Sequence, residues 1–263
     1  MKKSIKIFFI VILSGVIVYN AYAAVNWLLN QNTIEEELAE INEDIVMEEI
    51  EEGDNINPPE DTNDHYWQYI KMPLINVDVE ELKKTNSDTV GFLIVKGTNI
   101  NYPVVQAKDN LFYINHSFKK EKNDAGWIFM DYRNHALNLG KNTIIYGHSR
   151  IDKSMFGTLR NILKTSWINH KDNYIVQLST PRENTMWQVF SVYALPVTNY
   201  YITTDFPNDK QYEDWLNTMI GQSQHPFHTT INTDDKVLTL STCYERGNSE
   251  KRVVMHAKLI KKA

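Results

Sequence analysis

The sequence predicts a mainly-β domain with peripheral helices, built as a barrel or a sandwich. Eight short segments between residues 89 and 260 are rich in β-branched and aliphatic residues, and turn signals separate them. These segments do not alternate with helices as βα units do, which favours a barrel or sandwich over a parallel α/β sheet. The expected strands are 89–95, 102–105, 126–130, 142–146, 173–177, 185–196, 236–243 and 252–260.

Residues 1–30 predict a cytoplasmic basic flank and a membrane anchor. Lysines at positions 2, 3 and 6 precede an apolar stretch that starts at Ile7 and continues weakly to Leu29. About 20 largely apolar residues are near the minimum for a membrane-spanning helix. The basic flank is expected to stay in the cytoplasm, so the rest of the chain lies outside. A signal peptide cleaved after Ala23 is the alternative, and both interpretations imply export.

Residues 31–65 predict an acidic spacer outside the membrane. They contain 14 acidic and no basic residues. A loose helical spacing of aliphatic residues predicts a helix over residues 33–52, with Thr33 as its candidate N-cap. We interpret the segment as a solvated spacer, and a partner-binding acidic helix is the alternative.

Residues 66–263 predict one folded domain, long enough for a substantial core. Of the 27 basic and 33 acidic residues of the chain, 24 and 19 lie from residue 71 onward, so this part is about +5. Mild basicity suits a domain that faces an anionic cell envelope. No basic cluster interleaved with aromatic residues predicts nucleic-acid binding. Three helical stretches are expected, over residues 66–72, 155–163 and 209–222.

The single cysteine, Cys243, ends one expected strand, and Arg252 opens the next. Two consecutive strands joined by a short loop place the thiol and the guanidinium near each other. Positive charge favours the thiolate, which is the nucleophilic form of cysteine. An exported domain that relied on disulfides would carry an even number of cysteines, so a lone one suggests a reactive thiol. The alternative is a buried cysteine that acts as a small hydrophobe.

A cysteine nucleophile needs an imidazole to take its proton. Among the eight histidines, His148 follows Gly147 just after an expected strand, where loops carry function on a rigid scaffold. His256, inside the last strand, is expected to be structural, and most of the others are expected on the surface. No two histidines or acids show zinc-ligand spacing, so neither a metal nor another cofactor is expected.

Several motifs together resemble the sortases, the membrane-anchored cysteine transpeptidases of Gram-positive bacteria. The first is the run Leu-Ser-Thr-Cys over residues 240–243, followed by the strand-opening Arg252 and preceded far upstream by Gly-His. Class B of that family has segments similar to Gly-Trp-Ile-Phe-Met-Asp-Tyr-Arg-Asn at 126–134 and to the helical insert at 205–222. The cysteine-to-arginine loop is one residue shorter than in some class members. Arg246 is therefore a rival to Arg252, although Lys-Arg-Val-Val at 251–254 matches the strand start better.

The resemblance implies an eight-stranded β-barrel with N-terminal helices and a helix inserted before the cysteine strand. It implies that Cys243 attacks a threonine carbonyl in the C-terminal sorting signal of an exported surface protein. His148 would act as general acid and base, and Arg252 would bind the oxyanion or the substrate backbone. The acyl acceptor would be an amine of a peptidoglycan precursor or cross-bridge.

Other functions remain open. A pilin-polymerising sortase and a hydrolytic cysteine peptidase of the envelope would use the same nucleophile with another acceptor. An anchored adhesion module would have an unreactive thiol.

Five further residues are candidates for substrate binding. Ser241 and Thr242 lie beside the nucleophile, and alternation along the strand aims one of them toward the groove. Tyr201 and Ile202 precede the helical insert and are candidates for a groove wall, with core packing as the alternative. Glu245 is a candidate for orienting the histidine, with a solvated loop carboxylate as the alternative.

Overall fold

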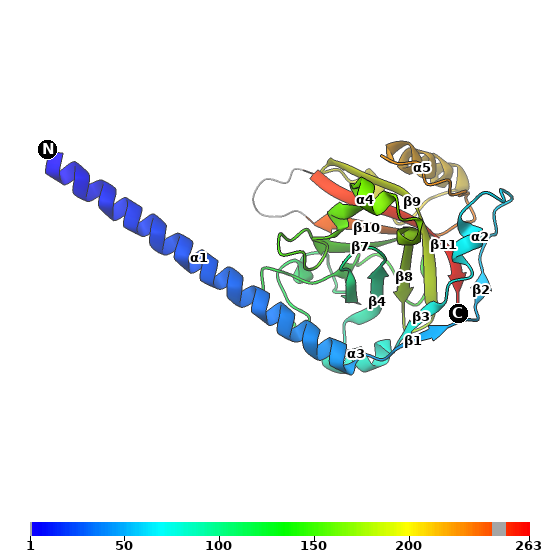
Figure 1. The fold of residues 1–263 in the computed structure, drawn as a ribbon, viewed down its shortest axis with the longest axis horizontal. Helices are drawn as coiled ribbons and strands as arrows, with labels where there is room; N and C mark the ends of the chain where they lie inside the picture. Colours follow the sequence, from blue (N-terminus) through cyan, green and yellow to red (C-terminus); the bar gives the residue numbers. More distant parts are fainter. Residues whose placement is uncertain (1, 244–250) are drawn as a thin grey trace.

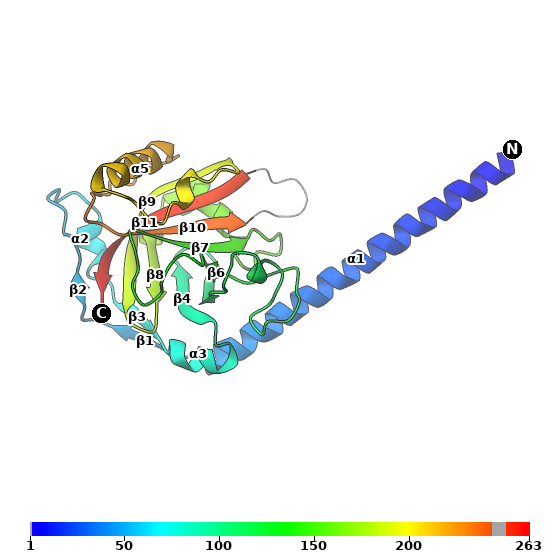
Figure 2. The ribbon, with the colours of Figure 1, turned by 180° about the vertical axis from the view of Figure 1, so that it is seen from behind.

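A closed eight-stranded β-barrel forms the centre of the structure (Figures 1 and 2). The computed structural model describes residues 2–243 and 251–263, of which residues 2–4, 44 and 243 are described by their backbone alone. Around the barrel the strands follow the order β10-β7-β6-β5-β4-β8-β9-β11, and pairing of β10 with β11 closes it. Their bounds are β4 Thr89–Val95, β5 Asn101–Val105, β6 Phe129–Met130, β7 Asn142–His148, β8 Ile175–Ser179, β9 Asn184–Pro196, β10 Val237–Cys243 and β11 Lys251–Lys262.

All eight expected strands are present, so the expected barrel is confirmed, but β6, β7, β8 and β11 differ from their expected bounds by two residues or more at one end or both. β6 is shorter because Gly126 has a φ of 61° and the Trp127 amide donates to the Tyr113 carbonyl instead of to a strand. β8 starts later because the 3₁₀ helix η3 (Lys171–Tyr174) precedes it. β7 runs two residues further than expected because β10 pairs with it in parallel to its last residue.

Two clusters of buried side chains stabilise the barrel. The main core contains Trp127 and Trp187, among the largest fully buried side chains. A second cluster lies between β9, β11 and the helix α5 (Asp209–Gln222), which has the expected bounds. Tyr212, Trp215 and Met219 of α5 face the sheet, and Asn208 caps the helix by accepting from the Gln211 amide.

The helix expected over residues 33–52 is wrong at both ends. One helix, α1, runs from Lys2 to Asp44, and Thr33 lies inside it, where its hydroxyl donates to the Leu29 carbonyl. The acidic segment 47–50 is instead the strand β1 (Met47–Ile50), because it pairs antiparallel with β3 (Leu74–Val77). Tertiary pairing thus overrides the local helical pattern. The two-residue strand β2 (Asp54–Asn55) pairs with β11.

The remaining elements are short. The helix expected over 66–72 is α2 (Tyr66–Tyr69), and the one expected over 155–163 is the 3₁₀ helix η2 (Leu159–Leu163). Helix α3 (Val79–Thr85) was not expected, although Asp78 caps it by accepting from the Glu81 amide. The others are α4 (Thr165–Ile168), η1 (Phe112–Ile114) and η4 (Tyr200–Ile202).

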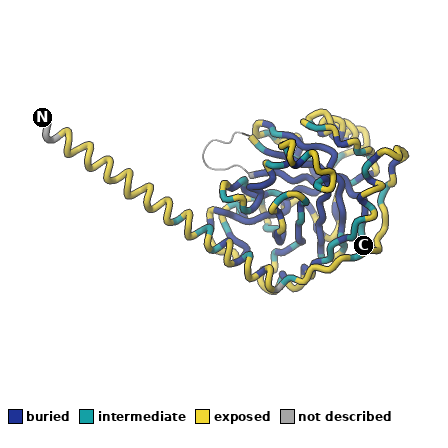
Figure 3. Tube along the Cα trace, viewed as in Figure 1, coloured by how far each residue is buried: buried dark blue, intermediate teal, exposed yellow. Residues whose placement is uncertain are grey.

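Helix α1 has two different halves. Its N-terminal half projects from the barrel with exposed apolar side chains, and it is long and apolar enough to cross a membrane (Figures 1 and 3). Its C-terminal half packs against the domain, where Ile34, Glu37 and Ile41 are buried. One face of the acidic segment is therefore not solvated.

Candidate active site

Three neighbouring strands bring the predicted catalytic residues to one level of the barrel. His148 is the last residue of β7 and is in parallel register with Cys243, the last residue of β10. On the other side of β10, the β11 pairing ends at Ser241 and Val254, and Arg252 lies two residues before Val254 on β11. Since neighbouring strands lie about 4.8 Å apart and β10 lies between β7 and β11, the strand that ends in the cysteine runs between the strands that carry the histidine and the arginine.

His148 is the last residue of its strand rather than a loop residue. A backbone carbonyl outside that strand holds its imidazole. Its Nε2 lies 2.6 Å from the carbonyl oxygen of Ile114, at the end of η1. A carbonyl only accepts, so this bond assigns the ring proton to Nε2. In the neutral ring, Nδ1 then carries the lone pair that can take a proton from a thiol.

The surroundings of His148 favour its neutral form. Burial lowers the pKa of His148 below its ordinary value, and only 9% of the residue is exposed. The hydrogen bond to Ile114 opposes this shift, whereas the charges of Arg150 and Arg252 lower the pKa further. The charge of Asp124 raises the pKa of His148, but this is the smallest of these contributions. The charge of Arg252 disfavours the imidazolium, and the same charge favours a thiolate nearby.

Two glycines allow the close packing around His148. A Cβ on Gly126 would lie 2.6 Å from the Ile114 oxygen and 2.9 Å from Cδ2 of His148. A Cβ on Gly147 would lie 2.7 Å from Cγ of Phe156. The Gly-His pair of the sequence therefore has a steric origin, because any side chain at 147 would collide with a buried ring.

Four of the five predicted substrate-binding residues lie in the part of the chain that the structure describes, and one lies outside it. Tyr201 and Ser241 are brought together, since their hydroxyl oxygens lie 3.0 Å apart. The Thr242 hydroxyl accepts from the Val253 amide at 3.0 Å and so ties β10 to β11. Ile202 is half-buried and packs against the second cluster. Glu245, like the rival arginine at 246, lies outside the described residues.

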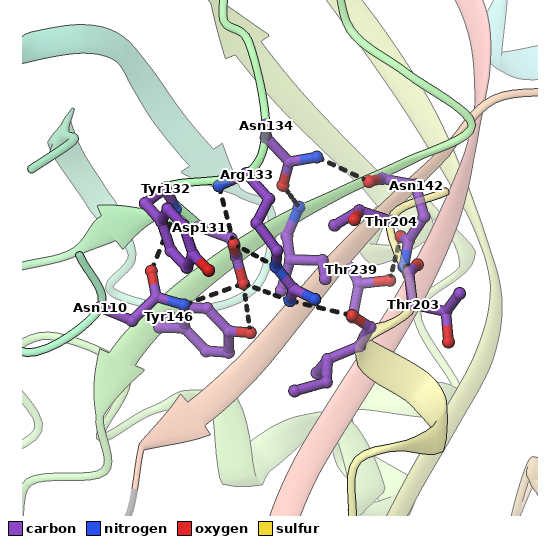
Figure 4. Close-up of polar contacts among 12 residues, drawn as sticks. Asn110, Asp131, Tyr132, Arg133, Asn134, Asn142, Tyr146, Thr203, Thr204 and Thr239 are labelled. Atoms are coloured by element: carbon purple, nitrogen blue, oxygen red, sulfur yellow. Dashed lines mark hydrogen bonds and ion pairs between the residues drawn. The ribbon is translucent and has the colours of Figure 1, made fainter. Parts of the chain in front are cut away.

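A buried acid beside the site escaped the sequence reasoning (Figure 4). Asp131, just after β6, is fully buried and accepts hydrogen bonds from Nε and Nη2 of Arg133 at 2.8 and 2.7 Å. It also accepts from the Tyr146 hydroxyl at 2.9 Å and from the Asn110 amide at 3.0 Å. Nη2 of Arg133 donates in addition to the Ile202 carbonyl at 3.0 Å. This network connects β7 with η4, one of the expected groove walls.

Asp131 is ionised in this network. Burial alone would raise its pKa, but the hydrogen bonds and charge of Arg133 and the bond from Tyr146 outweigh burial and hold the pKa below its usual value. The sequence signal was available, since an acidic and a basic residue two positions apart follow the buried β6 strand. Among the side chains that the structure describes, no group of three His, Cys, Asp or Glu could hold a metal ion.

Fold and site geometry together define the class of this protein. Residues 93–260 match the sortase domain family, so the chain belongs to the sortase family and is a cysteine transpeptidase. Its relatives are class B sortases, which confirms the resemblance seen in the sequence. This homology makes the protein a cell-wall sorting transpeptidase.

Three relatives illustrate this similarity. Sortase B of Listeria monocytogenes is 39% identical over 186 residues, which cover 70% of this chain and 75% of the relative. A Staphylococcus aureus sortase B–substrate complex has a TM-score of 0.66 at 38% identity and covers 70% of this chain and 84% of that one. A Bacillus anthracis protein described as similar to sortase B has a TM-score of 0.69 at 34% identity. The match covers 89% of this chain and 97% of that protein.

Proposed function

We propose that this protein cleaves the C-terminal sorting signal of exported proteins after threonine and transfers the new carboxyl end to an amine of peptidoglycan. The observation that carries the proposal is the shared register of His148 and Cys243, with Arg252 on the next strand. The substrate complex of the Staphylococcus aureus relative supports substrate binding by this fold. The acceptor and the threonine follow from the family resemblance.

The proposed first half-reaction forms a thioester. Nδ1 of His148 takes the proton of the Cys243 thiol, and the thiolate attacks the threonine carbonyl carbon. Arg252 donates hydrogen bonds to the oxyanion. The tetrahedral intermediate collapses, the C–N bond breaks, and the imidazolium of His148 gives its proton to the departing amine.

The proposed second half-reaction runs in the opposite direction. The acceptor amine attacks the thioester and passes a proton to His148, and collapse expels the Cys243 thiolate, which His148 reprotonates. A pilin-polymerising enzyme would use a lysine of the next subunit as the amine, and a hydrolase would use water. These two alternatives differ only in the acceptor.

The substrate groove is assigned to residues near the end of β10. We propose that Ser241, Thr242, Tyr201 and Ile202 form its wall and that Glu245 contributes on the basis of the resemblance alone. The hydroxyl pair of Tyr201 and Ser241 and the bond from Arg133 to the Ile202 carbonyl support a fixed wall.

The proposed location is the cell membrane, with a single pass. Residues 1–30 would supply the cytoplasmic flank and the anchor, 31–65 the extracytoplasmic segment, part of which packs on the barrel, and 66–263 the catalytic domain outside. The long apolar first half of α1 supports this arrangement, and the basic residues that precede it favour a cytoplasmic N-terminus.

The test uses the full-length protein in detergent micelles with a panel of quenched fluorescent sorting peptides, such as Asn-Pro-x-Thr-Asn and Ser-Pro-x-Thr-Gly types. Each peptide is incubated with and without triglycine, beside Cys243→Ala. Cysteine-dependent cleavage with the threonine end captured by triglycine is the expected result. Cysteine-dependent release of the free acid alone would favour the hydrolase. If no peptide is cleaved and the Cys243 thiol of the folded protein also resists alkylation, the proposal is overturned.

A further inference from the structure

The C-terminal half of α1 packs directly on the chain segment that precedes β6. Ile34, Glu37 and Ile41 follow one another at helical spacing and are only 2%, 3% and 5% exposed. The two isoleucines belong to the main core of the barrel domain. This part of α1 is therefore an integral element of the catalytic domain rather than a tether.

A buried carboxylate stands at the centre of this contact. Oε1 of Glu37 accepts from the Ser117 hydroxyl at 2.6 Å, and Oε2 accepts from the Lys119 amide at 3.4 Å. Lys119 also forms an ion pair with Glu40. About two turns earlier on the helix, the Asn123 side-chain amide donates to the Asn30 carbonyl at 3.0 Å. A buried carboxylate is costly unless it is hydrogen-bonded, so these bonds hold the segment at a defined place on the helix.

The docked segment is tightly folded on itself. The Ser117 amide donates to the Glu121 carbonyl at 2.8 Å, and the Asn123 amide donates to the Asn115 carbonyl at 3.0 Å. The Trp127 amide donates to the Tyr113 carbonyl at 2.9 Å. Residues 112–127 thus form one hydrogen-bonded unit between α1 and the barrel.

The same unit supplies the acceptor for the catalytic imidazole. The carbonyl of Ile114, three residues before Ser117, binds Nε2 of His148. Gly126, at the other end of the unit, is so close to both groups that a Cβ there would collide with the Ile114 oxygen and the imidazole. A small shift of the unit on α1 would therefore break or lengthen the bond that fixes the histidine.

We propose that the second half of α1 positions the catalytic histidine, with Glu37 as the positioning residue that acts through Ser117 and the Ile114 carbonyl. This inference rests on the proposed function, because it concerns the same reaction. It also implies that the helix which leads to the membrane is part of the active-site architecture, so unpacking this half of α1 from the domain lowers activity without touching the substrate groove.

The experiment compares variants of the full-length protein in detergent micelles. Glu37→Ala and Ser117→Ala remove the contact, Glu37→Gln keeps the shape and one acceptor, and Glu36→Ala removes an equal charge from the exposed face of the same turn. Asn208→Ala, which loses the cap of α5, controls for general destabilisation.

The expected result is a loss of about tenfold in kcat/KM for Glu37→Ala, mainly in kcat, with partial rescue by Glu37→Gln. The acidic limb of the pH–rate profile should move to lower pH, because the lost Ile114 bond no longer raises the pKa of His148. Glu36→Ala and Asn208→Ala should keep the wild-type profile. An unchanged kcat/KM and profile in Glu37→Ala would overturn the inference.

Two readouts do not depend on a sorting peptide. The rate at which iodoacetamide alkylates the lone cysteine, measured against pH, reports the thiol–imidazole pair. Hydrogen exchange of residues 112–127 reports the docked unit. Faster exchange and a shifted alkylation profile in Glu37→Ala alone support positioning even if no peptide is cleaved, whereas wild-type values in both would reject it.

Discussion

His148 and Cys243 occupy the same register position on two parallel strands, although the strands lie far apart in the sequence. Parallel strands require a long crossover, so the intervening chain can build the groove walls and α5 without disturbing the pair. Antiparallel pairing of β10 with β11 then adds Arg252 from the other side. The three predicted catalytic residues are thus positioned by strand register, which is more rigid than a loop.

Arg252 is expected to contribute more than charge. Arg252→Ala should lower kcat/KM by about 10²–10³-fold, as the loss of an oxyanion donor does elsewhere. Arg252→Lys should recover only part of this, because an ammonium lacks the planar fork of donors. Peptide-cleavage kinetics provide the measurement, with exposed Arg182→Ala as the control. A large loss in Arg246→Ala with an active Arg252→Ala would identify the rival arginine instead.

The pH–rate profile should have an acidic limb set by His148. The pKa of His148 lies below its ordinary value of 6.5, mainly through burial. The neutral base is therefore present at neutral pH, and kcat/KM falls as pH drops through that lowered pKa. Arg150→Gln removes a positive charge near the ring, so the limb should move to higher pH, whereas Arg150→Lys should leave it in place. No movement in Arg150→Gln would contradict this assignment.

The Asp131 network should couple stability to the groove. Asp131→Asn should lower the free energy of unfolding by about 2 kcal/mol, because charged hydrogen bonds to a buried carboxylate are lost. It should also raise KM more than it lowers kcat, since Arg133 holds the Ile202 carbonyl. Denaturant unfolding and cleavage kinetics measure both effects. Asp214→Asn, which breaks the exposed ion pair with Lys210, is the matched control and should change neither.

The strands could be predicted because their signals are local, and the position of Cys243 at the end of β10 follows from the same signals. Runs of β-branched residues predicted β7, β10 and β11 to within two residues. The acidic, helix-like pattern of the segment 47–50 predicts a helix, but pairing with β3 outweighs that pattern, and no local signal reveals the pairing. The extension of β7 to His148 has the same origin, since it depends on the distant β10.

The site was only partly predictable for a chemical reason. Gly-His and Thr-Cys combine residue types with a recognisable chemistry. The acceptor that orients His148 is the backbone carbonyl of Ile114, and a carbonyl has no residue-type signature. The docking of Glu37 was hidden by its acidic neighbours, because burial of one carboxylate among many cannot be read from composition.

His256 should make the protein less stable in acid. Its Nδ1 lies 2.8 Å from the Thr239 hydroxyl, and its Nε2 lies 2.7 Å from the Tyr193 hydroxyl. Thr239 donates to Asn142, so it accepts from Nδ1, and Nε2 accepts from Tyr193. Complete burial lowers the pKa of His256 to about 3, so the folded protein keeps the ring neutral.

The sign of the pH effect follows from that lowered pKa. Below pH 6.5 the unfolded chain binds a proton that the folded chain does not, so stability falls by about 1.4 kcal/mol per pH unit from this group until pH approaches 3. Urea unfolding at pH 7 and pH 5 measures the loss. His256→Gln should be less stable at pH 7 but show a smaller difference between the two pH values. An equal difference in both proteins would exclude His256 as the cause.

Gly126 should tolerate no side chain, and Gly140 offers a matched comparison. Gly126→Ala places a methyl group at a φ of 61°, within 2.6 Å of the carbonyl oxygens of Tyr113 and Ile114. The backbone strain alone costs about 1–2 kcal/mol in such a conformation. The displaced Ile114 carbonyl should also release His148. The fall in kcat should therefore be larger than the loss of folded protein accounts for. Gly140→Ala, which meets nothing within 4 Å, should keep wild-type unfolding and cleavage rates. Unfolding curves and kcat for the two variants check both expectations, and equal behaviour would mean that the contact between Gly126 and the histidine support is not restrictive.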